Sequence, residues 1–341
     1  MVSYHSPTGV AAWTDLKRSL KDDSLPDYLG APYVKTINGR KYWYDQYRIG
    51  NDRIHRYVGE DGPEMRDRLS RHEAISRNRE QSRKNRSRLM RILRAEDYLV
   101  SDVANGQAVS AMAKVGVFRL GGTLVGTQAF RCYEGELGVR LPLDQAAMTL
   151  DIDIASFERL SIALDDVVDR PLDEVFRDLE FEPVPTLDPG KTWKWRQTTR
   201  ETLVEFLTPS FEEAEEIRSL PALGVSAQSL HFLNYLIAEP IQVPFLYRSG
   251  VLVQVPRPER YAIHKLIVAD RRRNRDLKSA KDLAQAEYLI GILLRDRPDD
   301  LREAYETAMD AGPAWRRHIA SSLDKIPSVR EILHLTESSS K

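Results

Sequence analysis

The sequence is poor in cysteine, and this scarcity excludes several classes of protein. Cys132 is the single cysteine among 341 residues, so the chain can form no internal disulfide bond. A zinc site built from several thiolates is excluded for the same reason. The N-terminal stretch from Met1 to Trp13 has no apolar leader segment. No stretch reaches the roughly 18 apolar residues that a membrane helix needs. We therefore expect a cytoplasmic protein without a membrane partner.

An excess of charge of either sign is also missing. Lys and Arg number 50, Asp and Glu number 51, and the formal net charge is −1. Overall charge therefore indicates no partner, and only local patches can do so. The length allows one large core or two to three modest domains. Shifts in composition predict an N-terminal region over 1–110, a mixed α/β centre over 111–258 and a helical region over 259–341.

Local patterns predict the elements within these regions. Alternating aromatic and polar residues before residue 60 indicate short strands or a hairpin near Asn38-Gly39. The stretch from Glu64 to Val100 has no Gly or Pro, which favours one helix or two. Residues 128–136 form a short helix in this prediction. Strands are predicted over 114–125, 147–155, part of 193–208, 241–247 and 251–255. Helices are predicted over 259–270, 279–294, 297–310 and 313–323.

Two acidic residues on one predicted strand suggest a metal site. Asp151 and Asp153 are two residues apart, so both side chains project from the same face of the strand. Carboxylates held side by side repel each other unless a cation lies between them. Glu205, on a later strand, repeats the pattern of an acid between apolar residues. Three such acids on neighbouring strands suit two-metal phosphoryl chemistry, whereas an Asp-x-Asp pair at a solvated strand end would have no such role.

A glycine turn lies upstream of these acids. Gly126 follows a predicted strand and Thr127 opens a predicted helix. Glycine lets the backbone approach a ligand closely, and the free N–H groups of a helix start attract anions. A triphosphate would suit this site. The pattern is neither a Walker A motif nor a dinucleotide fingerprint. The alternatives are a plain turn with a threonine cap, or Gly121-Gly122 in the same role.

Basic residues are concentrated between positions 66 and 94. Eleven Lys or Arg residues and three acids give this stretch a net charge of 11 − 3 = +8. Such a run favours contact with a nucleic-acid backbone, and a solvated or acid-paired helix is the alternative. The candidate contacts are Arg77, Arg79, Arg83, Lys84 and Arg86. A second patch, formed by residues 271–273 and Arg275, would serve triphosphate or acceptor.

Together these features resemble the nucleotidyltransferase superfamily, which is related to polymerase beta and has a glycine turn, Asp-x-Asp and a third acid. More narrowly, the chain is similar to a bacterial family grouped with abortive-infection and MenT-type nucleotidyltransferases. The matching strings are Leu124–Phe130 with Tyr133, Thr149–Ala155, Val204–Pro209, Pro256–Leu266, Arg271-Arg272 and Lys281–Ala286, with an early match at Gly39–Tyr44.

This resemblance implies an α+β fold in which a small mixed sheet flanked by helices forms the nucleotidyltransferase core. An N-terminal strand and helix region and a C-terminal helical domain would flank the core. Gly126 and Thr127 would hold the β- and γ-phosphates, and Lys265 would contact the triphosphate. Asp282 would match a later acid near the active site. Glu205 stands where Asp is more usual, and it would join the Asp-x-Asp pair in binding Mg²⁺ or Mn²⁺.

The implied reaction is the transfer of a nucleoside monophosphate from an NTP to an acceptor hydroxyl. RNA, such as a tRNA end, is the first candidate acceptor, and a toxin or defence role with an antitoxin partner is the expected setting. A protein or small-molecule hydroxyl is an alternative acceptor. A nucleotide- or RNA-binding module without catalysis is a third interpretation, and the presence of all three acids argues against it.

Overall fold

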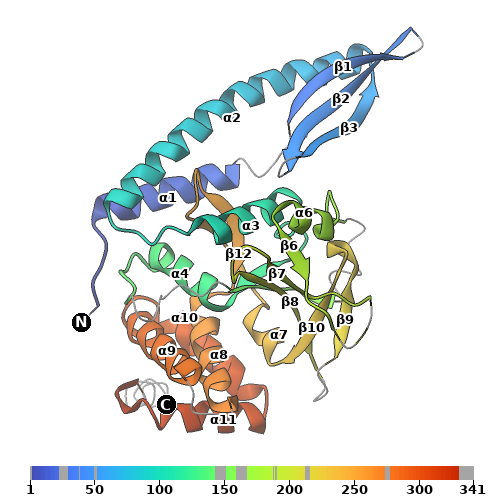
Figure 1. Ribbon diagram of the computed structural model, residues 1–341. Coiled ribbons are helices and arrows are strands. Elements are labelled where there is room, and N and C mark those ends of the chain that lie inside the picture. The colour runs from blue at the N-terminus through green and yellow to red at the C-terminus, as the bar shows by residue number, and fades with distance from the viewer. Residues whose placement is uncertain are drawn as a thin grey trace.

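A computed structural model describes residues 2–22, 30–37, 39–49, 52–142, 151–158, 167–186, 188, 190–211, 216–272 and 277–329. The chain adopts an α+β fold with a long N-terminal arm, a mixed sheet and a group of C-terminal helices (Figure 1). The sheet and the helices around it share one hydrophobic core. The predicted fold class is therefore confirmed, and the domain limits at residues 110 and 258 stay a prediction.

The arm consists of a three-stranded antiparallel sheet followed by one long helix. We use this name for β1 (Ala31–Ile37), β2 (Arg40–Ile49), β3 (Asp52–Glu60) and α2 (Pro63–Ala95). The helix runs along one side of the molecule and begins beside the sheet (Figure 1). Its other half packs on α1 (Pro7–Asp22), which buries Ala12, Trp13, Leu16 and Leu20 at helical spacing. The predicted hairpin at Asn38-Gly39 joins β1 to β2, although Asn38 itself lies outside the described residues.

The central sheet supplies the frame on which the acidic side chains lie. Its strand order is β4-β5-β8-β10-β9, and β7 pairs with both β6 and β8. The pairs β5–β8 and β8–β10 are parallel, and the other pairs are antiparallel. The strands are β4 (Thr123–Val125), β5 (Asp151–Ala155), β6 (Phe181–Pro183), β7 (Lys194–Gln197), β8 (Leu203–Ser210), β9 (Ile217–Leu220) and β10 (Val225–His231).

Helices and a hairpin surround this sheet. The helices are α3 (Val103–Lys114), α4 (Gly126–Leu137), α6 (Leu172–Asp178) and α7 (Leu233–Leu236), with a 3-10 turn over Pro221–Leu223. The hairpin is formed by β11 (Ile241–Phe245) and β12 (Val251–Val255), both of which were predicted. Trp195, Phe176 and Phe206 pack ring against ring beneath the sheet. Burial of these large rings fixes β7 and β8 in place.

The strand predicted over 114–125 is wrong for most of its length. Residues 115–121 form successive turns, and only Thr123–Val125 is a strand. Gly116 and Gly121 have φ values of +93° and +88°, in the left-handed region that an extended strand does not use. The amide of Leu120 donates to the carbonyl of Gly116, as in a helical turn. The apolar residues here face the core from turns, so alternation alone was misleading.

The C-terminal region is helical, as predicted. It contains α8 (Pro258–Arg271), α9 (Leu277–Asp296), α10 (Pro298–Asp310) and α11 (Pro313–Leu323), which gather at one end of the molecule (Figure 1). Prolines at the first turns of α8, α10 and α11 suit helix starts, where an N–H group needs no partner within the helix. The residues after 329 lie outside the described part. Among the described helices, none combines the length and apolarity needed to cross a bilayer.

Candidate active site

Two adjacent parallel strands carry the three predicted acidic residues. In the register of β5 and β8, Asp153 is opposite Glu205 and Asp151 is opposite Leu203. Asp151 and Asp153 are half-buried on one face of the sheet, while Ile152 and Ile154 are fully buried on the other. Glu205 keeps 23% of its side chain exposed. The apolar residues therefore anchor β5 in the core and hold the acids at its surface.

The glycine turn lies directly beside these acids. Val125 at the end of β4 pairs with Asp153, and Gly126 then begins α4 with a φ of +62°. A Cβ atom on Gly126 would lie 2.3 Å from Oδ2 of Asp153, closer than atoms can approach. Only glycine therefore combines this backbone conformation with this contact. The Tyr261 hydroxyl from α8 donates to the Gly126 carbonyl at 3.0 Å, which fixes the turn against the C-terminal helices.

The electrostatics of the acids favour a cation. Burial, reinforced by Glu205 and Asp151, raises the pKa of Asp153 from 3.8 to about 7. Burial and Glu205 also raise the pKa of Asp151. Both shifts mean that negative charge is costly here without compensation. Lys194 and Lys265 oppose the Asp153 shift only in part.

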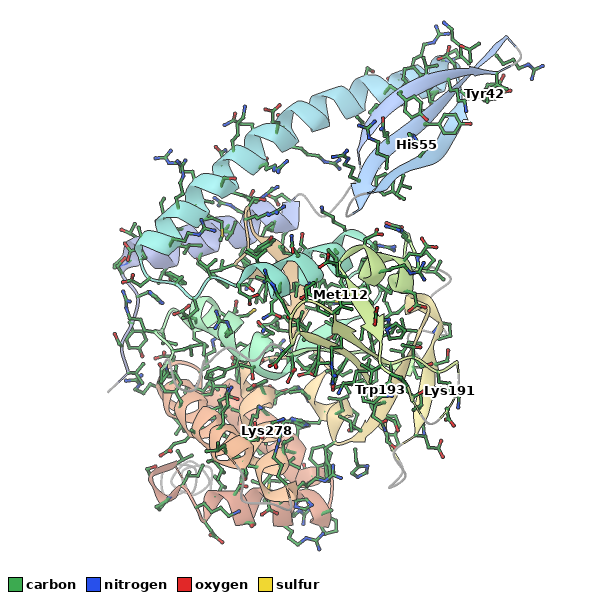
Figure 2. All side chains as sticks on the ribbon, in the orientation of Figure 1. Tyr42, His55, Met112, Lys191, Trp193 and Lys278 are labelled. Carbon is green, nitrogen blue, oxygen red and sulfur yellow. The ribbon has the colours of Figure 1, made fainter. Side chains whose placement is uncertain are left out.

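A lysine that the sequence prediction missed lies opposite the third acid. Lys194 of β7 is the cross-strand partner of Glu205, and its Nζ is 2.6 Å from Oε1 of Glu205. The same ammonium lies 5.8 Å from the ring centre of Trp193. Figure 2 labels Trp193 in the region of the central sheet. The antiparallel pairing of β7 with β8 creates this contact, and neither strand reveals it alone.

A second group of charges comes from α8 and α9. Nζ of Lys265 lies 2.5 Å from Oδ1 of Asp282, and Nε of Arg272 lies 2.9 Å from Oδ2 of the same carboxylate. Lys265 and Asp282, two of the four residues predicted for the nucleotide site, are therefore in direct contact. Lys281, which was not singled out from the sequence, reaches toward Thr127, with Nζ 3.5 Å from Oγ1.

The basic residues near this site differ in their protonation and their contacts. Burial, with Lys265 nearby, lowers the pKa of Lys281. His264 is buried, and burial lowers its pKa to about 3. It is therefore a neutral packed side chain. Arg271 lies over the ring of Phe232 at 5.0 Å, and residues 273–276 of the second basic patch lie outside the described residues.

The donors on β5 fit a hard divalent cation. Two half-buried carboxylates share one face, and their repulsion is the kind that Mg²⁺ or Mn²⁺ relieves. Across the described part of the chain, no three His, Cys, Asp or Glu side chains are grouped closely enough to hold a metal ion. The carboxylate of Glu205 pairs with Lys194 instead. The metal assignment therefore stays a prediction.

The basic residues proposed for nucleic acid all lie on α2 but are not equivalent. Arg83 and Lys84 are exposed, and Lys84 lies 2.8 Å from Glu80 on the same helix. Arg79 is half-buried. Arg86 is only 8% exposed and contacts Ser19 of α1, so its guanidinium faces the interior. The side chain of Arg77 lies outside the described residues.

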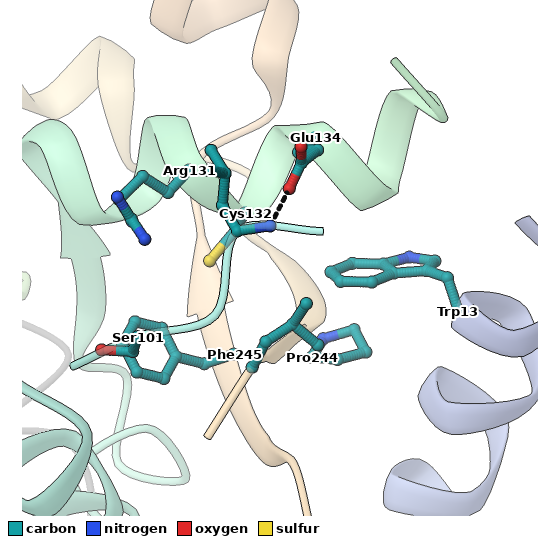
Figure 3. Close-up of a pocket in the computed structure, with 9 residues that line it drawn as sticks. Trp13, Ser101, Arg131, Cys132, Glu134, Pro244 and Phe245 are labelled. Atoms are coloured by element: carbon teal, nitrogen blue, oxygen red, sulfur yellow. Dashed lines mark hydrogen bonds between the residues drawn. The ribbon is translucent and has the colours of Figure 1, made fainter. Parts of the chain in front are cut away.

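A separate pocket lies between α1, α4 and the β11 end (Figure 3). Within it, Glu134 accepts a hydrogen bond from the Leu99 amide at 2.6 Å, and Arg131 donates to the Val100 carbonyl at 3.2 Å. Both side chains thus hold the segment that leads into α3. Burial raises the pKa of the Cys132 thiol to about 12, so this group stays protonated and is no nucleophile. We assign the pocket a structural role.

Comparisons with known proteins give the family. A family model described as "Nucleotidyltransferase" matches residues 104–310, and a domain of unknown function, DUF6788, matches residues 13–67. Among solved structures, an antigenic nucleotidyltransferase-like protein from Paracoccidioides brasiliensis is similar, with 13% identity and a TM-score of 0.36. That match covers 69% of this chain and 94% of the other. Curated proteins give no match.

The family match spans the sheet, the glycine turn, the three carboxylates and the helices that carry Lys265 and Asp282. It also covers well over half of the chain. The chain therefore belongs to this nucleotidyltransferase family.

Proposed function

We propose that the protein transfers a nucleoside monophosphate from an NTP to a hydroxyl of RNA, using Mg²⁺ or Mn²⁺. The observation that carries this proposal is the register that sets Asp153 beside Glu205, next to the Gly126 turn. A transferase needs this combination because the metal-binding acids and the phosphate-binding backbone must meet at one point. Asp151, Asp153 and Glu205 would be the metal ligands.

The chain's own groups have separate parts in this reaction. The start of α4 presents backbone N–H groups and the Thr127 hydroxyl to the β- and γ-phosphates. Lys281, 3.5 Å from Thr127, and Lys265 supply positive charge on the same side. Asp282 holds Lys265 in place. The bound metal would neutralise the triphosphate and favour loss of the acceptor's proton.

The chemistry is an in-line displacement at the α-phosphate. A bond forms between the acceptor oxygen and the α-phosphorus, and the bond to the bridging oxygen of pyrophosphate breaks. The acceptor's proton passes to a carboxylate of the cluster. Positioning by the sheet and the glycine turn contributes most, because phosphoryl transfer needs little covalent help from the protein.

Lys194 would change partner during the cycle. In the protein alone, its ammonium neutralises Glu205 at 2.6 Å. Metal binding at the three acids would supply the same compensation and would release the lysine. A released lysine beside the site would then face the triphosphate, where positive charge is useful. The ion pair with Lys194 thus compensates the charge of the partly buried Glu205.

RNA is the acceptor that the charge pattern supports best. The stretch from 66 to 94 has a net charge of 11 − 3 = +8, and Arg83 and Lys84 are exposed on α2. Neutralising phosphates in this way releases counterions and gives salt-dependent binding. We leave Arg86 out of this contact because it is buried against α1. A protein or small-molecule hydroxyl would not need such a helix.

Labelling of the acceptor tests this function. Purified protein is incubated with each α-³²P-labelled NTP and Mn²⁺, together with total RNA or total protein. We expect label in RNA that ribonuclease removes and protease does not. The paired variant Asp151→Asn with Asp153→Asn should lose this labelling and keep its fold. Label confined to protein or to small molecules would overturn the RNA assignment, and equal labelling by the paired variant would overturn the site.

The relation to abortive-infection and MenT-type transferases is part of the same proposal. It suggests that the protein acts in the cytoplasm as a toxin or defence factor that an antitoxin restrains. Induced expression should then arrest growth of a bacterial host, and the Asp151→Asn, Asp153→Asn variant should not. Equal growth arrest by both proteins would argue that the effect does not come from transfer.

A further inference from the structure

One face of the arm's sheet combines aromatic rings with exposed positive charge. By the register of the three strands, Tyr33, Tyr44 and His55 lie on the same face. Tyr33 and Tyr44 stack with ring centres 5.7 Å apart, and His55 meets Tyr33 edge-on at 5.5 Å. The Tyr33 hydroxyl is 3.0 Å from Nδ1 of His55. Figure 2 labels Tyr42 and His55 on this sheet.

The opposite face is already covered. Trp43 packs on Met65 and Leu69 at the start of α2. Tyr47 and Ile54 pack against the main core. The sheet therefore gains its stability from this second face, and the ring cluster on the first face is not needed as a core. We call the first face the ring face.

The charges on the ring face select the partner. Arg48 of β2 and Arg53 of β3 are directly opposite each other, and both side chains are exposed, as is Lys35 of β1. Two like charges in cross-strand positions destabilise a sheet. Among the described residues, no carboxylate forms an ion pair with any of these three cations. A polyanion lying across the strands would relieve this repulsion.

We propose that the ring face binds an unpaired stretch of the RNA acceptor, with Arg48 and Arg53 on its phosphates and Tyr33 against a base. Every base has a π-face, so stacking on a ring is possible only where the base is not already stacked in a duplex. The rings would therefore select unpaired nucleotides, and the arginines would supply the affinity for the backbone. This inference rests on the proposed RNA acceptor and adds that part of it is single-stranded.

Binding of a fluorescent single-stranded RNA to the full chain tests this inference. Reversing two charges with Arg48→Glu and Arg53→Glu should weaken binding at least tenfold. It should also lower the slope of log affinity against log salt by about 1.4, at roughly 0.7 per phosphate contact. Arg316→Glu with Arg317→Glu on α11 reverses the same number of exposed charges far along the chain, and this control should bind as the wild type does.

A second variant tests the inference without changing any charge, in case charge reversal disturbs the sheet. Tyr33→Leu keeps an apolar side chain but removes the stacking ring, and it should weaken binding of single-stranded RNA roughly tenfold. Affinity for a fully paired RNA of the same length should be lower and should not respond to this change. Unchanged binding of single-stranded RNA by both variants would overturn the inference, as would equal affinity for paired RNA.

This result can be separated from failure of the transfer chemistry. The binding assay uses no NTP and no metal, so it is repeated with the Asp151→Asn, Asp153→Asn variant. Wild-type affinity in that variant is expected, because the ring face and the acids lie on different sheets. If the wild-type protein bound single-stranded RNA through the ring face but left RNA unlabelled, the transfer chemistry would be refuted and the ring-face inference would remain.

Discussion

Asp153→Asn should make the protein more stable at neutral and alkaline pH. The substitution removes a carboxylate whose ionisation the folded state opposes, through burial and the nearby charges of Glu205 and Asp151. An asparagine of nearly the same shape leaves the packing of Ile152 and Ile154 on the other face untouched. An acid whose charge destabilises its own fold is what we expect at a cation site.

The gain in stability can be calculated from the pKa shift of Asp153. The pKa of Asp153 rises from 3.8 in the unfolded chain to about 7 in the folded protein. At 1.36 kcal/mol per pKa unit, this difference corresponds to about 4 kcal/mol. The side chain keeps some contact with solvent, which screens its charge, so about 2 kcal/mol is the better expectation.

Because the pKa of Asp153 is raised by folding, the variant should gain stability only over a defined pH range. Below pH 3.8 both states hold the proton and the charge costs nothing. As the pH rises toward 7, the unfolded state ionises first, so the wild-type protein loses stability relative to the variant. Above that pH the difference is constant. Asp153→Asn should therefore match the wild type at the acidic end and exceed it at pH 8.

Urea denaturation in EDTA at several pH values measures this difference. Glu182→Gln, which neutralises an exposed acid on β6, is the control and should change stability little at any pH. Chelation keeps trace metal from stabilising the wild-type acids. If Asp153→Asn is no more stable than the wild type at pH 8, or if its advantage is the same at every pH, the charge of Asp153 does not destabilise the fold.

Three further predictions concern the same site. Gly126→Ala should lower the free energy of unfolding by about 1 to 3 kcal/mol, because the left-handed backbone is strained for alanine and its Cβ would clash with Asp153. It should also abolish transfer. Urea denaturation measures the first effect and label transfer the second, and a fully active variant would contradict the contact. Lys194→Met should tighten Mn²⁺ binding roughly tenfold by freeing Glu205, as measured by electron paramagnetic resonance, and weaker binding would show that the lysine does not compete. Mn²⁺ should raise the melting temperature of the wild type and EDTA should reverse this, whereas Asp151→Asn with Asp153→Asn should not respond.

Periodicity predicted part of the helical structure, but it did not predict α1, α3, α6 or α7. The four C-terminal helices and the helix after Gly126 match the structure, because their apolar residues recur at helical spacing and glycine or proline marks their ends. The turns at residues 115–121 were not predicted, because the same apolar residues also suit a strand. Nothing in the local pattern shows that Gly116 and Gly121 take left-handed φ values.

The acids were predictable and their partners were not. The Asp-x-Asp spacing fixes one face of β5 whatever surrounds it, and the acid of β8 falls beside it by the parallel register. The Lys194–Glu205 pair depends on how β7 folds back on β8, which is a long-range property. Burial of Arg86 could have been found, since Arg86, Met90 and Leu93 are spaced four and three residues apart on one helical stripe.

We propose that the acids beside Gly126 bring about attack on the α-phosphate of an NTP. The most direct measurement compares α-³²P-labelled with γ-³²P-labelled NTP in the presence of Mn²⁺ and RNA. We expect label in RNA from the α-labelled nucleotide alone, with the γ-label released as pyrophosphate. Incorporation of the γ-label, or equal α-label incorporation by Asp151→Asn with Asp153→Asn, would contradict it.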